Sequence, residues 1–116
     1  MKVFKLKEAE SFQTSEGMMT PLFANEKVAV THLEIPKGLN IKPHSHQGDG
    51  ILILTKGSIK LTCEDPATLE AGDMAYVPGC TEVGLECGVD SAALLLSVPS
   101  KYRDVKEFRD VLRKMF

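Results

Sequence analysis

Two of the three histidines in this 116-residue chain, His44 and His46, are separated by one serine and lie between Gly38 and Gly57. Side chains alternate between the two faces of an extended backbone, so both imidazoles point the same way, about 6–7 Å apart along the strand. That separation allows two imidazoles to bind one metal ion at roughly 2.0–2.1 Å each. Two histidines are one ligand short of a catalytic metal site, so the function depends on whether a third ligand exists.

Two further residues near the histidine pair carry chemistry, and each has a plain structural alternative. Asp49 lies in the segment Gln47-Gly48-Asp49-Gly50, where the glycines permit positive φ and a close approach of a ligand to the backbone. The alternative for Asp49 is a turn residue. Cys80 follows Pro78-Gly79 and is a candidate thiolate ligand or redox group; its alternative is an inert cysteine.

The composition limits the classes of partner. The net charge is −2, and acidic and basic residues alternate along the chain without a basic face, which argues against nucleic acid. The longest apolar run, Ala92 to Val98, is far too short to span a membrane, and the polar N-terminus has no apolar signal core. Three cysteines without Cys-x-x-Cys spacing disfavour a disulfide scaffold or zinc ribbon, so we expect a cytoplasmic protein.

Short apolar segments recur about every ten residues with Gly or Pro turns between them, which indicates an antiparallel all-β sandwich or barrel. The expected strands are 28–35, 50–55, 58–63, 68–69, 74–77, 83–87 and 92–98. Alternation along these strands predicts which side chains point inward. The predicted inward set is Leu52, Leu54, Ile59, Leu61, Val83, Leu85, Leu94 and Leu96.

The C-terminal segment changes to a helical period. Apolar residues recur there at helical spacing, opposite a charged face: Val105, Phe108, Val111, Leu112 and Met115. We expect an amphipathic helix over about 102–115, capped by Asp104 or Ser100 and packed on its own barrel. The whole chain, 1–116, is predicted to be one domain.

Taken together, these spacings resemble the cupin superfamily in its small single-domain form. The first family motif matches Gly38, His44, His46 and Gly57, and the second motif begins with a match over Gly72 to Pro78. The resemblance covers roughly residues 28–98. It implies a jelly-roll barrel (double-stranded β-helix), often dimeric, with any ligand held at the barrel mouth.

Two of the four metal ligands that the resemblance implies are missing. The position of the family's glutamate is Gly50, and the position of its second-motif histidine falls on Val83. Strand alternation supports an inward Val83, with Leu85 and Cys87. A turn one residue shorter would place Glu82 inward instead, giving a set of two histidines and one carboxylate suited to Fe(II), Mn(II) or Zn(II). That arrangement would also bury a second carboxylate, which is costly unless it is paired.

Three functional hypotheses follow. The first is a cupin that binds a divalent metal (Fe, Mn, Ni or Zn) or a small organic ligand through His44 and His46, with Glu82, Asp49 or Cys80 as weaker candidate ligands. If it is an enzyme, the resemblance implies metal-dependent dioxygenase, isomerase or lyase chemistry without choosing among them. The second is a metal-free module that binds or senses a small molecule, and the third is a homodimeric interaction protein without a ligand.

Overall fold

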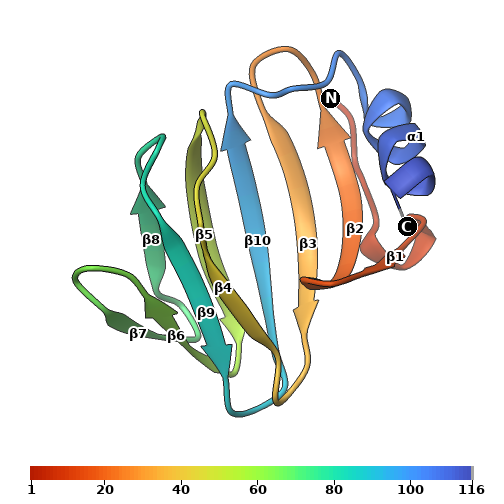
Figure 1. The fold of residues 1–116 in the computed structure, drawn as a ribbon. Coiled ribbons are helices and arrows are strands. Elements are labelled where there is room, and N and C mark those ends of the chain that lie inside the picture. The colour runs from red at the N-terminus through yellow and green to blue at the C-terminus, as the bar shows by residue number, and fades with distance from the viewer. Residues whose placement is uncertain (116) are drawn as a thin grey trace.

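Glycine and proline turns divide the chain into ten strands and one α-helix over residues 1–115, the part that the computed structural model describes (Figure 1). The elements are a 3₁₀ turn Leu6–Glu8, β1 Phe12–Thr14, β2 Gly17–Ala24, β3 Ala29–Ile35, β4 Asn40–His44, β5 Asp49–Lys56, β6 Ser58–Thr62, β7 Ala67–Glu70, β8 Met74–Val77, β9 Val83–Cys87, β10 Ser91–Val98 and α1 Val105–Met115. The segments expected to be strands are strands. Within 1–115, no helix is long and apolar enough to cross a membrane.

The strands form two antiparallel sheets that face one another. The six-stranded sheet has the order β1-β2-β3-β10-β5-β8, and the four-stranded sheet has the order β4-β9-β6-β7. Figure 1 shows the smaller sheet lying against one side of the larger one. This arrangement confirms the antiparallel all-β fold predicted from the strand pattern, and it is the double-stranded β-helix that the family resemblance implies.

Alternating side chains from both sheets fill the space between them. Among the largest fully buried side chains are Leu54, Ile59 and Ile35, which are 0%, 1% and 2% exposed. They pack with Leu52, Leu61, Leu69, Leu85, Cys87 and Ala93 in one apolar cluster. Val83 packs against the same cluster, as the inward registration of β9 predicts.

Strand β10 corrects one part of the predicted inward set. Ala93 and Leu95 point into the core, whereas Leu94 and Leu96 were expected there. The pairing of β10 with β5 shifts between Ala92 and Ala93, and this irregularity sets which face each residue takes. A continuous apolar run has no polar residue to mark its outer face, so periodicity alone cannot assign the faces.

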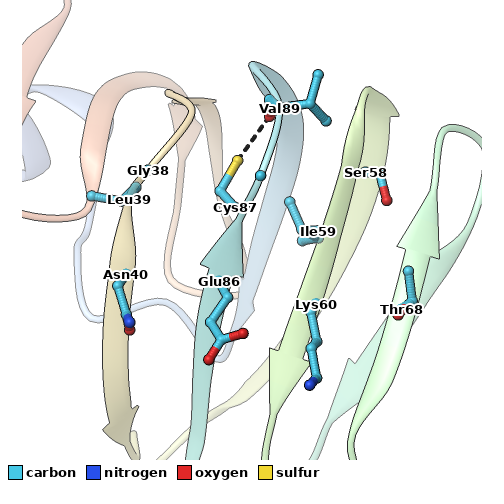
Figure 2. Close-up of a pocket in the computed structure, with 11 residues that line it drawn as sticks. Gly38, Leu39, Asn40, Ser58, Ile59, Lys60, Thr68, Glu86, Cys87 and Val89 are labelled. Atoms are coloured by element: carbon cyan, nitrogen blue, oxygen red, sulfur yellow. Dashed lines mark hydrogen bonds between the residues drawn. The ribbon is translucent and has the colours of Figure 1, made fainter.

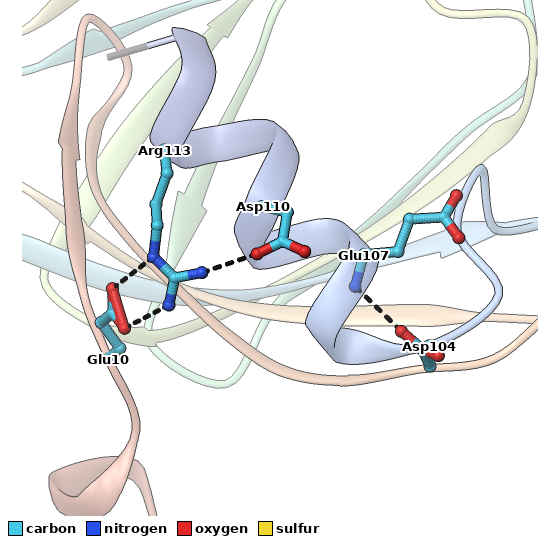
Figure 3. A network of polar contacts seen from close by, with 5 residues as sticks. All are labelled: Glu10, Asp104, Glu107, Asp110 and Arg113. Carbon is cyan, nitrogen blue, oxygen red and sulfur yellow. Dashed lines mark hydrogen bonds and ion pairs between the residues drawn. The ribbon is translucent and has the colours of Figure 1, made fainter.

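Helix α1 packs on its own chain, against β2. Phe108 and Leu112 are its buried residues, and the Tyr102 ring stacks on Phe108 at 4.3 Å between centroids. The Asp104 carboxylate accepts a hydrogen bond from the backbone N–H of Glu107 at 2.8 Å, so Asp104 is the cap. Arg113 joins the helix to Glu10, with its Nε 3.2 Å from Oε2 (Figure 3).

Candidate functional site at the barrel mouth

One end of the barrel, here called the mouth, is formed by the end of β4, the loop 45–48, the start of β5 and the loop 78–82. Two backbone contacts tie these segments together. The N–H of Cys80 donates to the carbonyl of His46 at 2.6 Å. A Cβ on Gly48 would lie 3.0 Å from the carbonyl oxygen of Val98, so the end of β10 also borders the mouth. The two histidines are therefore carried on a loop that is tied to both neighbouring segments.

His44 is the last residue of β4 and lies directly opposite Val83. Opposed residues of antiparallel strands share a face, and Val83 packs against the core, so His44 is on the inner face. Both ring nitrogens have partners: Nδ1 is hydrogen-bonded to the carbonyl of Lys42 at 3.1 Å, and Nε2 lies 3.2 Å from Oε1 of Glu16, the distance of an ion pair. The ring orientation is thus fixed on two sides.

His46 lies just beyond the strand, yet its ring contacts that of His44. The two centroids are 4.9 Å apart, and the rings are nearly perpendicular. The pKa of His46 lies below its ordinary value of 6.5, first because the ring is partly buried and then through its charge interactions with His44 and Lys101; Glu16 opposes this shift. The neutral ring, which both donates and accepts a hydrogen bond, is therefore favoured at His46.

Asp49, a weaker candidate ligand, braces the mouth. Its carboxylate accepts hydrogen bonds from the backbone N–H of Gly79 at 2.8 Å and from the hydroxyl of Tyr76 at 2.9 Å. The bond to the carboxylate raises the pKa of Tyr76. These contacts hold Asp49, the first residue of β5, to the loop 78–82 and to Tyr76.

Although the backbone of Cys80 is bonded to His46, Cys80 and Glu82 line a groove that includes neither histidine. This groove of about 730 Å³ lies between the β6–β7 turn and the loop 78–82, and it is lined by Pro43, Thr62, Cys63, Glu64, Asp65, Cys80, Thr81 and Glu82. Cys80 has a positive φ of 65° and is exposed, and its thiol is free. Since Val83 takes the inward position of β9, the neighbouring Glu82 is exposed.

A second groove, of about 520 Å³, crosses the outer face of the four-stranded sheet. Its floor carries a row of polar residues on neighbouring strands, in which Asn40 pairs with Glu86 and Glu86 with Lys60 (Figure 2). These residues alternate with inward residues such as Ile59 and Cys87, so the row faces away from the core. The groove is separate from the mouth and contains no histidine.

Gly50 leaves room at the mouth where the family's glutamate is missing. A Cβ at this position would meet only Cδ1 of Leu95 at 3.8 Å and Cβ of Val77 at 4.0 Å, which are ordinary contacts. By contrast, a Cβ on Gly79 would overlap the carbonyl oxygen of Gln47. Gly50 is therefore not required by backbone crowding, and its neighbours are apolar.

The ligand set was tested for a metal ion. The bond from Nδ1 of His44 to a backbone carbonyl is the orientation that leaves Nε2 for a metal. Within residues 1–115, however, no group of three or more His, Cys, Asp or Glu side chains is arranged to hold an ion. Gly50 and Val83 contribute no ligand atom. The residues present do not fit a resident metal centre, which needs at least three protein ligands.

Two residues of the mouth were missed by sequence reasoning, Glu16 and Lys101. Glu16 is in the β1–β2 turn, and Lys101 follows β10, so neither is close in sequence to the histidines. The folding of two distant segments onto the mouth brings them there. Spacing along the chain carries no signal for such contacts.

Comparison with known proteins decides the family. The cupin-domain family model matches residues 31–99. The chain belongs to the cupin family. No curated protein matches the sequence of this cupin at a significant level.

Solved structures show the same fold. An RmlC-like cupin from Shewanella frigidimarina has a TM-score of 0.79 and 18% identity, over 87% of this chain and 94% of that one. KdgF from a Halomonas species has a TM-score of 0.79 and 19% identity, over 87% and 96%. The polyketide cyclase RemF from Streptomyces resistomycificus has a TM-score of 0.77 and 14% identity, over 90% and 83%. At such identities the likeness establishes the fold alone.

Proposed function

We propose that this cupin binds a small organic molecule at the barrel mouth, through His44 and His46 and without a resident metal. The observation that carries the proposal is the pair of imidazoles, with ring centroids 4.9 Å apart, at the end of β4 where His44 lies opposite the inward Val83. Binding sites for small molecules combine an apolar wall with a few placed polar groups. Here the imidazoles supply the polar groups.

The apolar wall comes from residues that line the inner face just below the histidines. Ile41, Val83 and Leu95 are half-buried and pack against the core cluster. Below them the cluster is fully buried, so a ligand would rest on this layer and not enter the barrel further. A shallow site of this kind suits a compact molecule with one polar end and one apolar part.

The likeness to a polyketide cyclase and to KdgF is in keeping with a small-molecule ligand, as is membership of the cupin family. Binding of a divalent metal by the two histidines is the competing hypothesis. A ligand that brings its own donor atoms would be needed to complete such a site. Binding that depends on an added metal would therefore favour this alternative.

The proposal is tested by a fragment screen that records the shift in melting temperature, run with EDTA present. We expect some fragments to stabilise the wild type and the His32→Ala control but not the His44→Ala/His46→Ala variant. His32 pairs with Leu94 in the six-stranded sheet, on the face opposite the core, and so controls for loss of an imidazole. Equal stabilisation of all three proteins would contradict the proposed site.

We further propose that the chain forms a homodimer through the outer face of the six-stranded sheet. Two rows of mostly apolar residues cross four strands there: Tyr76, Ile51, Leu96 and Val30 in one row, and Met74, Ile53, Leu94 and His32 in the other. Met74 and Tyr76 are 55% and 59% exposed. Enrichment in aromatic residues and Met without charge is typical of the centre of an interface.

Light scattering during gel filtration tests the dimer. We expect the wild type at twice the chain mass of 12.7 kDa and the Met74→Glu variant as a monomer. Thr68→Glu places the same charge on the outer face of the other sheet and should leave the mass unchanged. A monomeric wild type would contradict the dimer.

The free cysteines, Cys63, Cys80 and Cys87, support our proposal of a cytoplasmic location.

A further inference from the structure

A carboxylate of the chain itself occupies the polar side of the mouth. Oε1 of Glu16 lies 3.2 Å from Nε2 of His44, and both side chains are partly open to solvent, at 43% and 41% exposed. An imidazole that carries protons on both nitrogens donates a hydrogen bond to the carbonyl of Lys42 and forms an ion pair with Glu16 at the same time. Glu16 is thus the group that now meets the outward nitrogen of His44.

The β1–β2 turn holds Glu16 in this place. The hydroxyl of Thr14, a buried residue, accepts a hydrogen bond from the N–H of Glu16 at 3.0 Å and donates to the carbonyl of Gly17 at 2.8 Å. Gly17 has a φ of 101°, and a Cβ there would overlap the carbonyl oxygen of Glu34, so the turn packs directly on β3. The backbone beneath Glu16 is fixed, whereas its side chain is free to swing out.

Positive charge collects around the same point. The charges of His44 and Lys101 both act on His46 and make its protonation less favourable. The carboxylate of Asp49 is directed at the N–H of Gly79 and the hydroxyl of Tyr76. Within residues 1–115, Glu16 is the carboxylate that both faces His44 and acts on the pKa of His46.

We propose that the ligand of the mouth carries a carboxylate, which replaces the carboxylate of Glu16 on His44, and that Glu16 is a tethered competitor for this position. The inference rests on the proposed function and names its ligand class. A ligand carboxylate would accept from Nε2 of His44 while the apolar part of the ligand lies toward Gly50. Lys101 adds attraction for a single negative charge.

The test compares benzoate with its neutral isostere benzamide, by NMR titration of the ring protons of His44 and His46. An exposed ion pair is worth at most about 1 kcal/mol, so removing Glu16 should tighten benzoate binding by up to about fivefold. We expect this gain in Glu16→Ala and a smaller one in Glu16→Gln, with the affinity for benzamide unchanged. Glu82→Gln, on the outer groove, is the matched control and should behave as the wild type.

Each outcome decides between two claims. The carboxylate site is supported if benzoate binds more tightly to the single variant Glu16→Ala than to the wild type, and if this gain in affinity disappears in the double variant Glu16→Ala/Lys101→Gln. Perturbation of His46 by both probes without any gain on removing Glu16 overturns the tethered competitor but leaves the proposed function standing. If neither probe perturbs either ring in any variant while the fragment screen also finds no His44- and His46-dependent binder, both claims fail.

Discussion

The two ends of the barrel interior differ in what fills them. At the closed end, Leu54 and Ile59 are 0% and 1% exposed, and every neighbour in the cluster is apolar. At the mouth, the same two sheets end in His44 and His46 and in a carboxylate brought by the β1–β2 turn. Strand β5 belongs to both regions, since it begins with Asp49 at the mouth and reaches Leu54 in the core.

The contrast shows that stability and binding are assigned to different residues of the same strands. Buried apolar contacts hold the sheets together, and they do not require the polar groups of the mouth. The mouth polar groups are partly solvated, so exchanging one for another costs little folding free energy. Substitutions at the two ends should therefore have separable effects.

The largest effect is expected in the core. Leu54→Ala removes a fully buried side chain and leaves a cavity, which should lower the free energy of unfolding by about 3–4 kcal/mol. Urea denaturation measures this loss. The ring signals of His44 and His46 should keep their wild-type positions in the folded variant. A loss below 1 kcal/mol would mean that the closed end is not the main source of stability.

The next largest effect is expected at two glycines of the mouth, whose replacement by alanine should have different effects on stability. A Cβ on Gly79 would overlap the carbonyl oxygen of Gln47, so Gly79→Ala should cost about 2 kcal/mol. Gly50→Ala meets only ordinary contacts and should change stability by less than about 0.5 kcal/mol, but it reduces the room beside the histidines. Melting curves of both variants check the expected stabilities, and fragment binding to Gly50→Ala checks the expected loss of room. Equal destabilisation by the two substitutions would contradict the room at Gly50.

A smaller loss is expected at the brace of the mouth. Asp49→Ala leaves the N–H of Gly79 without its acceptor and should cost about 1 kcal/mol. Amide hydrogen exchange should speed up over the loop 78–82 while exchange in β6 stays unchanged. Asp65→Ala, on the β6–β7 turn, is the control. An exchange pattern identical to the wild type would show that Asp49 does not brace the mouth.

The smallest effect concerns pH. Burial lowers the pKa of His46 in the folded protein below the ordinary value of 6.5. Between that folded value and 6.5, the unfolded chain binds more protons than the folded protein. The free energy of unfolding therefore falls as the pH falls below 6.5, and His46 causes no such loss above 6.5. Denaturation curves over this range should show a shallower decline in His46→Gln. The same decline in both proteins would rule out His46 as its source.

The sequence anticipated the parts of the fold that local chemistry determines. Gly38, Gly57 and Gly72 all adopt the positive φ that their turns require. Helical spacing predicted the buried Phe108 and Leu112, and of the two caps considered, Asp104 and Ser100, the structure shows Asp104. Among the two registrations considered for β9, alternation of apolar residues selected the inward Val83.

The rest depends on contacts between distant segments. Leu94 and Leu96 were placed on the wrong face because the apolar run in β10 marks neither face, and a shift in its pairing with β5 decides. Glu16 reaches His44 across 28 positions of sequence, a contact set by how the β1–β2 turn packs on β3. Cys80 and Glu82 were considered as candidate ligands beside the histidines, but they line the outer groove.

The metal content of tag-free protein, purified without chelators beside the His44→Ala/His46→Ala variant, tests the central claim most directly. The account predicts that neither protein carries a stoichiometric transition metal, because within residues 1–115 no three His, Cys, Asp or Glu side chains are arranged to hold an ion, and Gly50 and Val83 contribute no ligand atom. Close to one equivalent of Fe, Mn, Ni or Zn in the wild type, lost in the variant, would contradict it.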